Sequence, residues 1–296
     1  MQVNKMRKNN IILREKEFSE AEKLRVYLMM IAVGGFLGAY TFTLKGGVFC
    51  NAQTANFVLL AVQLGKGSFH RALYYFIPIS AYLLGAVLSE FLPKYVNSVG
   101  FARWETFFIA IEALCLLILG FIPDSAPVQI FQVTVNFIAS MQYNTFRAAQ
   151  HVPMATTFCT NHLRQVGVNI VGTAHRDPEA KRRLVMHILM ILSFVAGGIV
   201  SAFLCVRLGG RAIWGAVVLL IIVFADLLVD DLAGGEKTAP ANDTHARRGK
   251  RNFSAGSGKT SDTAKNNARF FENLLIFPVL CDIVLRVSHE NFGIAP

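Results

Sequence analysis

The sequence predicts an all-α fold: a polytopic bundle of membrane helices made of two related units. Three observations lead to this prediction. Of the 296 residues, 53% are hydrophobic and only 16% are charged, whereas about 25% of the residues of a soluble domain are charged. Apolar runs close to the ~20 residues that span a bilayer recur along the chain. Polar and charged residues gather toward both ends of the sequence.

The ends of the chain differ from its middle in composition. Residues 1–25 form a polar arm, residues 26–230 the predicted transmembrane domain, residues 231–269 a basic linker without fixed structure, and residues 270–296 a tail with an interfacial helix. The net charge of +10 comes mainly from the tails and short loops. We therefore predict a membrane protein with both termini in the cytoplasm, and no nucleic-acid partner.

Eight apolar segments divide the predicted transmembrane domain, and the second and sixth of them are unusually polar. An arginine at mid-depth costs about 2.5–3.5 kcal/mol, so the sixth segment, which contains Arg164, cannot face lipid. Such a segment is enclosed by other helices, broken, or re-entrant. The eight segments span residues 26–44, 48–64, 72–92, 104–122, 128–147, 152–171, 184–206 and 212–230.

An internal repeat is predicted, with units over residues 26–122 and 128–230. Gly85–Leu92 and Gly197–Leu204 share Gly, Ser, Phe and Leu at a shift of 112 residues (197 − 85), and a polar segment precedes each of them. Eight crossings would make the two units parallel. Six crossings, with both polar segments turning back, would make them inverted. The sequence leaves this choice open.

Small residues four positions apart predict close helix packing in three segments. These pairs are Gly34 and Gly38, Gly85 and Ser89, and Gly197 and Ser201. Residues with this spacing share one helix face and let neighbouring backbones approach. We expect packing inside the monomer in preference to a dimer interface.

A polar stripe marks the fifth segment. Its members follow one another at steps of three or four, which puts them on one helix face: Gln129, Gln132, Asn136, Ser140, Tyr143 and Arg147. In a membrane this face either bonds to neighbouring helices or lines a wet cavity. The number of amides favours the cavity, so Gln132, Asn136 and Ser140 are predicted to line a pore.

The two polar segments carry the candidate binding residues. If these helices are interrupted at mid-depth, their free N–H groups and positive ends can hold an anion, and the guanidinium of Arg164 suits a carboxylate or phosphate. Interhelical hydrogen bonding is the alternative. The candidates are Asn51, Thr54 and Asn56 in the first unit, and Thr157, Thr160, Asn161 and Arg164 in the second.

Glu112 is an acidic residue near the middle of a strongly apolar segment. A carboxyl group inside a membrane indicates function by default, because it is costly to bury as an anion. We predict that Glu112 couples the site to protons. A structural partner such as Arg164 or a glutamine is the alternative.

The stretch Gly-Gly-Val-Phe-Cys-Asn-Ala-Gln-Thr-Ala-Asn-Phe at residues 46–57 resembles the YoaK family of bacterial integral membrane proteins. Ala55 stands where that family usually has glycine. The resemblance extends to Thr157–Leu163 and Gly85–Leu92, and covers roughly residues 25–230. It implies a compact multi-pass protein of the cytoplasmic membrane whose role is not established, and it brings no site residues.

These patterns predict a small permease for a polar or anionic solute. A membrane-embedded interaction or sensory module is the alternative, in which the same polar residues hold the bundle together. The histidines, including His162 and His187, show no metal-ligand spacing, and no nucleophile arrangement or cofactor motif is recognisable. We therefore predict no enzyme, no metal and no cofactor. The expected partners are membrane lipids and the solute, with the oligomeric state undefined.

Overall fold

The computed structural model describes residues 18–99 and 102–233, which lie within the first of two compact units, residues 1–238. Over these residues the predicted all-α helical bundle is confirmed, and one short β-hairpin accompanies the helices. Most of the predicted N-terminal arm, nearly all of the linker and the interfacial helix of the tail lie outside the described residues.

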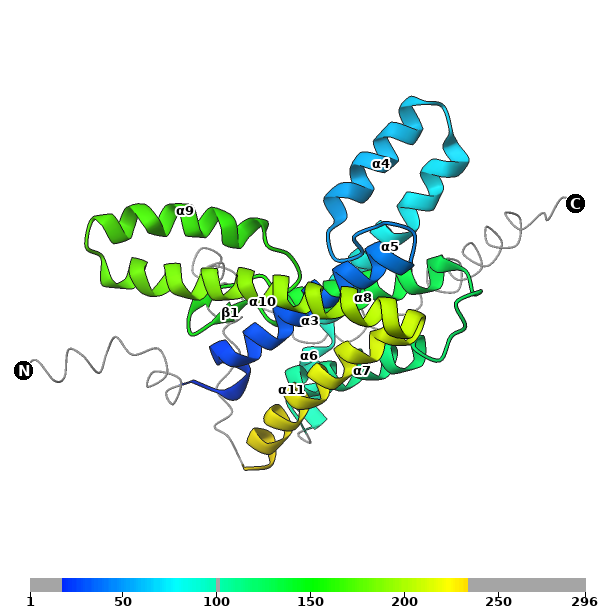
Figure 1. Cartoon of the computed structure of the whole chain (residues 1–296). Coiled ribbons are helices and arrows are strands. Elements are labelled where there is room, and N and C mark those ends of the chain that lie inside the picture. Colours follow the sequence, from blue (N-terminus) through cyan, green and yellow to red (C-terminus); the bar gives the residue numbers. More distant parts are fainter. Residues whose placement is uncertain (1–17, 100–101, 234–296) are drawn as a thin grey trace, which may run out of the picture. The chain divides into compact units, whose positions relative to one another are not determined.

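The elements follow one another along the chain as Figure 1 labels them. In the first half they are η2 (Glu20–Glu22), α3 (Leu24–Leu44), α4 (Gln53–Gly65), α5 (Phe69–Phe91), α6 (Pro93–Val99) and α7 (Trp104–Leu119). In the second half they are α8 (Val128–Thr145), β1 (Ala148–Ala149), β2 (Val152–Pro153), α9 (Thr160–Ala174), α10 (Pro178–Leu208), η3 (Gly209–Ile213) and α11 (Trp214–Leu232).

Each of the eight predicted segments contains a helix, but the two polar ones begin late. The second helix begins at Gln53 and not near residue 48, and the sixth begins at Thr160 and not near residue 152. The residues before them form connections without helical structure, and the second connection contains the β1–β2 hairpin. Gln150 and His151 turn that hairpin with φ values of 48° and 65°, a backbone conformation that is uncommon for non-glycine residues.

One end of the bundle, called here the Lys45 end, is held together by polar contacts around Asp124. The Lys45 side chain pairs with Asp124 at 2.9 Å, and the Gly210 N–H donates to the same carboxylate at 3.2 Å. The Tyr40 hydroxyl donates to the Gly210 carbonyl at 2.9 Å. These bonds join the end of α3 to the α7–α8 loop and to the turn between α10 and α11.

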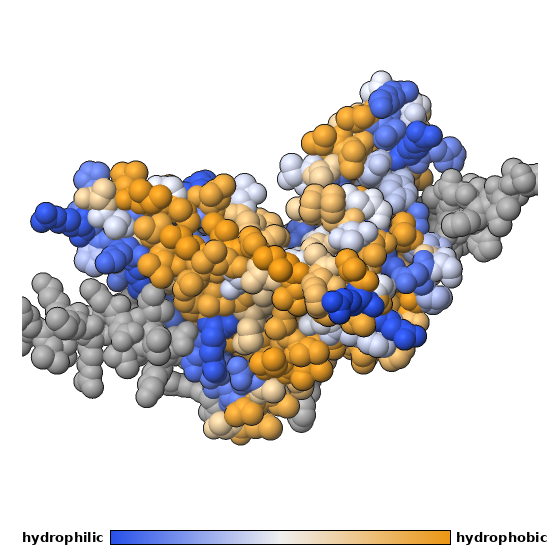
Figure 2. Space-filling view, viewed as in Figure 1, coloured by the Kyte–Doolittle hydropathy of each residue, from blue (hydrophilic) through white to orange (hydrophobic). Residues whose placement is uncertain are grey.

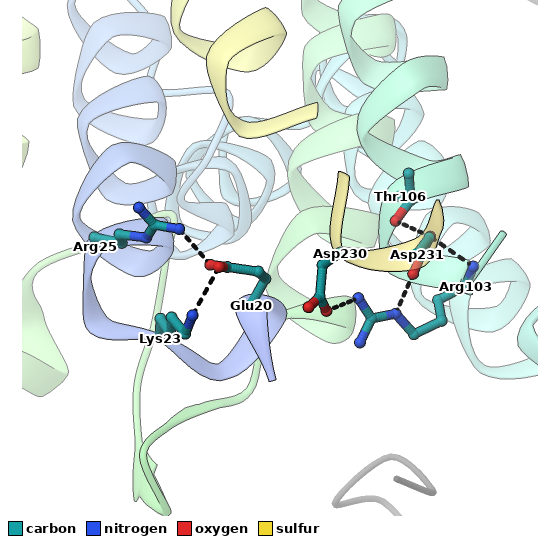
Figure 3. Close-up of polar contacts among 7 residues, drawn as sticks. All are labelled: Glu20, Lys23, Arg25, Arg103, Thr106, Asp230 and Asp231. Carbon is teal, nitrogen blue, oxygen red and sulfur yellow. Dashed lines mark hydrogen bonds and ion pairs between the residues drawn. The ribbon is translucent and has the colours of Figure 1, made fainter. Parts of the chain in front are cut away.

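The opposite end, called here the Arg103 end, has its own charge cluster (Figure 3). Arg103 forms ion pairs with Asp230 and Asp231 at the end of α11, and the Thr106 hydroxyl donates to Asp231 at 2.7 Å. Near the start of α3, Glu20 accepts bonds from Lys23 and Arg25, as Figure 3 also shows. The start of α7 is thereby fixed to the end of α11.

The contacts at the two ends give the direction of each long helix. Helices α3, α7 and α10 run toward the Lys45 end, whereas α8 and α11 run away from it. Helix α5 also runs away from it: the Tyr74 hydroxyl near its start bonds to Gln132 near the start of α8, and Asn144 near the end of α8 bonds to Ser89. The long helices therefore alternate in direction along each half of the chain.

Glycines make the closest helix contacts. A Cβ atom at Gly197 of α10 would collide with the Ala32 carbonyl of α3, and one at Gly35 of α3 would collide with the Phe194 carbonyl. In the other half, a Cβ at Gly85 of α5 would collide with the Phe137 carbonyl of α8. The predicted close packing inside the monomer is therefore confirmed for Gly197 against α3 and Gly85 against α8, whereas Gly34 and Gly38 of α3 contact residues 156–157 and 51, which lie outside the helices.

The surface of the bundle is largely apolar. Figure 2 shows hydrophobic residues spread over the visible faces of the helices, with hydrophilic residues gathered at projecting ends. Within the described residues, three helical stretches are long and apolar enough to cross a membrane: Leu24–Leu44, Phe69–Ser98 and Pro178–Leu232. This surface is typical of a membrane protein.

Candidate functional site

The connection between α3 and α4 turns back into the bundle. Gly46 and Gly47, with φ values of 91° and 69°, reverse the chain after Lys45. The buried Asn51 then donates through Nδ2 to the Gly34 carbonyl at 2.9 Å. Gly34 lies ten residues before the end of α3, or about 15 Å along the helix axis. Residues 45–52, called here the first connection, are therefore re-entrant.

The connection between α8 and α9, residues 146–159, reaches the same part of α3 from the other end. We call it the second connection. A Cβ at Gly34 would lie 2.5 Å from the Thr156 carbonyl oxygen and 3.1 Å from the Thr157 Cα. A Cβ at Gly38 would lie 3.2 Å from the Asn51 amide nitrogen. Both connections therefore pack against the Gly34–Gly38 face of α3, which explains why both positions are glycine.

The two connections meet at this face. The Asn51 side chain donates to the Thr157 carbonyl at 2.6 Å, in addition to its bond to Gly34. Helices α4 and α9 both begin just after this contact, at Gln53 and Thr160. The N-termini of two short helices therefore lie near the centre of the bundle, and this region is called here the central site.

From the central site the two short helices run toward opposite ends. Helix α4 leads through a short turn to the start of α5 at the Lys45 end. Helix α9 packs along α10, where Arg183 bonds to Asn169, and leads to the start of α10 at the Arg103 end. Figure 1 shows the α4–α5 and α9–α10 hairpins projecting in different directions.

Neither short helix has a side-chain cap at the central site. The N-cap residues are Ala52 and Cys159, and neither makes a side-chain capping bond. The first N–H groups of a helix have no partner within that helix, and the aligned peptide dipoles give the N-terminus a positive potential. Two such ends near one another favour a negatively charged or electron-rich group.

Hydrogen bonds join α8 to both ends of the first connection. At its start, the Gln132 side chain donates to the Lys45 carbonyl at 2.9 Å. Just after its end, Gln53 bonds to Asn136 of α8 and to the Cys50 carbonyl, and it accepts a bond from Asn56 at 2.9 Å. The first connection is thereby fixed to α8 near both of its ends.

The predicted pore-lining residues make contacts between helices. Gln132 joins the first connection to α5, Asn136 accepts from Gln53, and the Ser140 hydroxyl donates to the Tyr82 carbonyl at 2.5 Å. All three are buried. In this structure the three side chains bond to neighbouring parts of the bundle, which was the alternative to lining a pore. A pore-lining role stays a prediction.

Several predicted binding residues are exposed. Thr54 and Thr160 lie in the first turns of α4 and α9, next to the central site, and Arg164 lies one turn further along α9. The Arg164 guanidinium bonds to the half-buried Asn161, one turn earlier on the same helix, at 3.3 Å. Helix α9 turns its other face, with His162 and Asn169, toward α10. The described residues therefore do not enclose Arg164, and its role in binding stays a prediction.

Glu112 is fully buried in α7, and neither carboxyl oxygen has a hydrogen-bond partner among the described residues. The proposed structural partner Arg164 is not paired with it. Among the hydrogen bonds of the described residues, none joins Glu112 to Asn51, so a link between the predicted binding and proton-coupling residues stays a prediction.

Sequence reasoning missed several buried polar groups close to the central site. Gln142 donates to the Met30 carbonyl at 2.9 Å and to the Thr156 carbonyl at 3.4 Å. The Thr156 hydroxyl, like that of the predicted Thr157, is buried without a partner among the described residues. His162 bonds to His187. The sequence contained one signal for His162. It stands 106 residues after Asn56 (162 − 56), the same offset that relates Thr160 to Thr54, so it occupies the place of a polar residue of the first unit.

Comparisons with known proteins place the chain in a family without a known role. A family model described as "Protein of unknown function (DUF1275)" matches residues 26–225, which is 200 of the 296 residues (225 − 26 + 1). No curated protein and no solved structure matches the chain. The matched range covers α3 to most of α11 and includes both connections. The chain therefore belongs to the DUF1275 family of proteins of unknown function.

Proposed function

We propose that this protein is a permease that moves a small polar or anionic solute across the bacterial inner membrane. The observation that carries the proposal is the contact between the two connections at the Gly34–Gly38 face, where Asn51 bonds to Thr157 and both short helices begin. Secondary transporters place their substrate sites near mid-depth, where interrupted helices present their N-termini. The stretch that resembles YoaK proteins, residues 46–57, contains the first connection except Lys45.

The arrangement of helices supports an inverted repeat. In the first unit the short helix runs toward the Lys45 end, and in the second it runs toward the Arg103 end. The packing is reciprocal: α3 of the first unit packs on α10 of the second, and α8 of the second packs on α5 of the first. Units over residues 26–122 and 128–230 would then be related by an axis in the membrane plane, with six crossings and cytoplasmic termini.

The unpartnered groups of the central site favour an electron-rich solute. The first N–H groups of α4 and α9 and the hydroxyls of Thr156 and Thr157 are donors. A carboxylate, a phosphate-like ion or a sugar hydroxyl offers acceptors to such a set. Because the potential of both helix ends is positive, an anion is favoured over a neutral solute.

Glu112 supplies the proposed proton coupling. A carboxyl group without a partner in an apolar interior is costly to hold as an anion, and a change of its protonation would alter the packing of α7. We propose that the protein alternates between states in which Glu112 is neutral and charged. The proposal assigns no catalytic step and no cofactor to the chain.

Transport by the purified full chain in liposomes tests this proposal. The probes are radiolabelled acetate, phosphate and sulfate, with glycerol as a neutral solute, under an imposed pH gradient. Asn51→Ala should abolish the uptake of the transported anion, and Glu112→Gln should remove its dependence on the pH gradient. Ser80→Ala, whose hydroxyl bonds only within α5, serves as the matched control. Equal uptake by all three variants and by the unchanged chain would exclude the assigned roles.

The alternative is a membrane-embedded interaction or sensory module. The bonded state of Gln132, Asn136 and Ser140 favours it, since these residues then act as links between helices. This alternative predicts that deletion of residues 231–296 abolishes activity in cells, whereas Glu112→Gln has little effect. The permease proposal predicts the reverse, a larger effect of Glu112→Gln than of the deletion.

A further inference from the structure

A pair of buried histidines joins α9 to α10, and the proposed transport mechanism does not use it. His162 and His187 are 0% and 1% exposed, and their Nδ1 atoms lie 2.9 Å apart. The His162 Nε2 atom lies 2.6 Å from the Ala155 carbonyl oxygen. The two rings are therefore titratable groups inside the bundle. His162 lies three residues after the N-cap of α9.

The hydrogen bonds assign the tautomer of each neutral ring. A carbonyl oxygen only accepts, so the His162 Nε2 atom carries a proton and donates to Ala155. The Nδ1 atom of a neutral His162 therefore carries a lone pair and no proton. It follows that the His187 Nδ1 atom carries the proton of the 2.9 Å bond and that His187 Nε2 holds a free lone pair.

We propose that the His162–His187 pair is a proton-binding site that takes up one proton. The proton comes from water and bonds to the free lone pair of His187 Nε2. The pair then holds three protons on four ring nitrogens and one positive charge, which the rings share through the bond between their Nδ1 atoms. A second proton would place two N–H groups face to face at the 2.9 Å separation, so the capacity of the pair is one.

Charged side chains flank both histidines. Arg183 lies one turn before His187 on α10, and Arg164 lies two residues after His162 on α9. Residues 28–39 of α3, which packs on α10, carry no titratable side chain. The titratable side chains of α9, α10 and their cap residues, apart from the pair and two cysteines, are Arg164, His175, Asp177, Glu179, Lys181, Arg182, Arg183 and Arg207. Of the two acids among them, Asp177 pairs with Arg183 at 3.6 Å and Glu179 bonds to Arg182.

The pair is linked to the central site through the second connection. Ala155, which accepts the His162 bond, directly precedes Thr156 and Thr157, and Thr157 bonds to Asn51. A positive charge on the pair adds to the positive potential at the N-terminus of α9. This step rests on the proposed function: an anion at the central site and a proton on the pair stabilise each other, and a monovalent anion then enters with its charge balanced.

Nitrogen NMR of the full chain in lipid bilayers tests the pair without any solute. Labelled histidine rings should show His162 as the Nε2–H tautomer and His187 as the Nδ1–H tautomer at pH 7.5, with a through-bond coupling between the two Nδ1 nuclei. Stepwise acidification from pH 7.5 to pH 3.5 should add one proton, and no second proton, to the pair. His175→Gln, which removes an exposed histidine of α9, should leave these signals unchanged, and His187→Gln should remove the coupling.

The native Cys159, the N-cap of α9, reports the effect on the second connection. In a chain with the other four cysteines replaced by alanine, alkylation of Cys159 is compared with that of the same chain carrying His187→Gln. Each rate is normalised to the denatured chain at the same pH. The ratio of the two rates should change several-fold between pH 7.5 and pH 3.5. Two Nε2–H tautomers without coupling, uptake of two protons, or a constant rate ratio would each overturn the proposal, whereas absent transport would overturn only the proposed function.

Discussion

The first and second connections occupy matching places in the chain but differ in how their polar groups are satisfied. In the first connection, Asn51 makes two hydrogen bonds and the adjoining Gln53 bonds to α8. In the second, the hydroxyls of Thr156 and Thr157 are buried without partners among the described residues. Unsatisfied buried donors are rare in folded proteins and call for an explanation.

The charged side chains at the start of the two connections differ as well. The Lys45 side chain at the start of the first connection is 2% exposed, and its amino group lies 3.8 Å from the centroid of the Phe131 ring and pairs with Asp124. Arg147 at the start of the second connection is 41% exposed and pairs with Glu90, which is 62% exposed. The first connection is thus held by a buried network, whereas the second contains buried hydroxyls without partners among the described residues and bonds through Ala155 to the histidine pair. Four substitutions test this contrast, and they are given in decreasing order of their predicted loss of stability.

Gly34→Ala should produce the largest loss of stability. Its Cβ would lie 2.5 Å from the Thr156 carbonyl oxygen, which is backbone and cannot rotate away. Overpacking of this kind costs about 1–3 kcal/mol, and we expect the upper end. Gly38→Ala is the matched control, since its Cβ would meet only the Asn51 side chain at 3.2 Å. Thermal unfolding of the two variants in detergent measures the difference. Equal losses would show that the second connection moves freely away from α3.

Asn51→Ala should come next, because one amide holds both connections. The change removes the bonds to the Gly34 and Thr157 carbonyls and leaves two buried acceptors. With about 0.6–1.7 kcal/mol for each polar contact between helices in a membrane, we expect a loss of about 2 kcal/mol. Thermal unfolding gives the loss, and Asn144→Ala, at the more exposed contact between α8 and α5, provides the comparison. A smaller loss for Asn51 than for Asn144 would contradict a central role for Asn51.

The fold was predictable from the sequence to a considerable extent. Apolar runs of sufficient length located α3, α5, α7, α8, α10 and α11, because lipid-facing helices need nearly continuous hydrophobic residues. The polarity of the second and sixth segments predicted an interruption. The point where each helix begins was not predictable, because Asn51 and Thr157 are held outside the helices by contacts with Gly34, far away in the sequence.

The candidate site was only partly predictable. Asn51, Asn56 and Thr157 are buried near the centre, as their amide and hydroxyl groups within apolar surroundings suggested. Composition could not show on which side of α9 each residue lies, so Arg164 was assigned to the interior although it is exposed. The histidine pair was missed because 25 residues separate its members (187 − 162) and their meeting depends on the packing of α9 against α10.

Asp124→Asn should have a moderate, acid-dependent effect. The hydrogen bond from Lys45 holds the pKa of Asp124 below its usual value of 3.8. The charged carboxylate therefore contributes stability that is complete above about pH 4 and is lost as the pH falls through the lowered pKa. The change leaves the buried Lys45 without its partner, and we expect a loss of about 1 kcal/mol, since Asp124 itself is largely exposed.

Glu90→Gln is the matched control for Asp124→Asn, because it breaks the exposed pair at the other entrance. Its effect should be about 0.5 kcal/mol or less. Thermal unfolding measured at pH 7 and at pH 3 distinguishes the two variants. The difference in melting temperature between Asp124→Asn and the unchanged chain should be smaller at pH 3 than at pH 7. A difference that is the same at both pH values would mean that the Asp124 charge does not stabilise the Lys45 end.

Thr157→Val should have the smallest effect on stability and so gives the sharpest test of the contrast. The substitution keeps the shape of the side chain and removes a hydroxyl that has no partner among the described residues, so the unfolding free energy should change by less than about 0.5 kcal/mol or rise. Thr106→Val is the matched control, since it removes a bond to Asp231 and should destabilise the Arg103 end. If Thr157 contacts the solute, Thr157→Val should still lower anion uptake. A marked loss of stability would show that the Thr157 hydroxyl has a structural partner, and the second connection would then be as fully satisfied as the first.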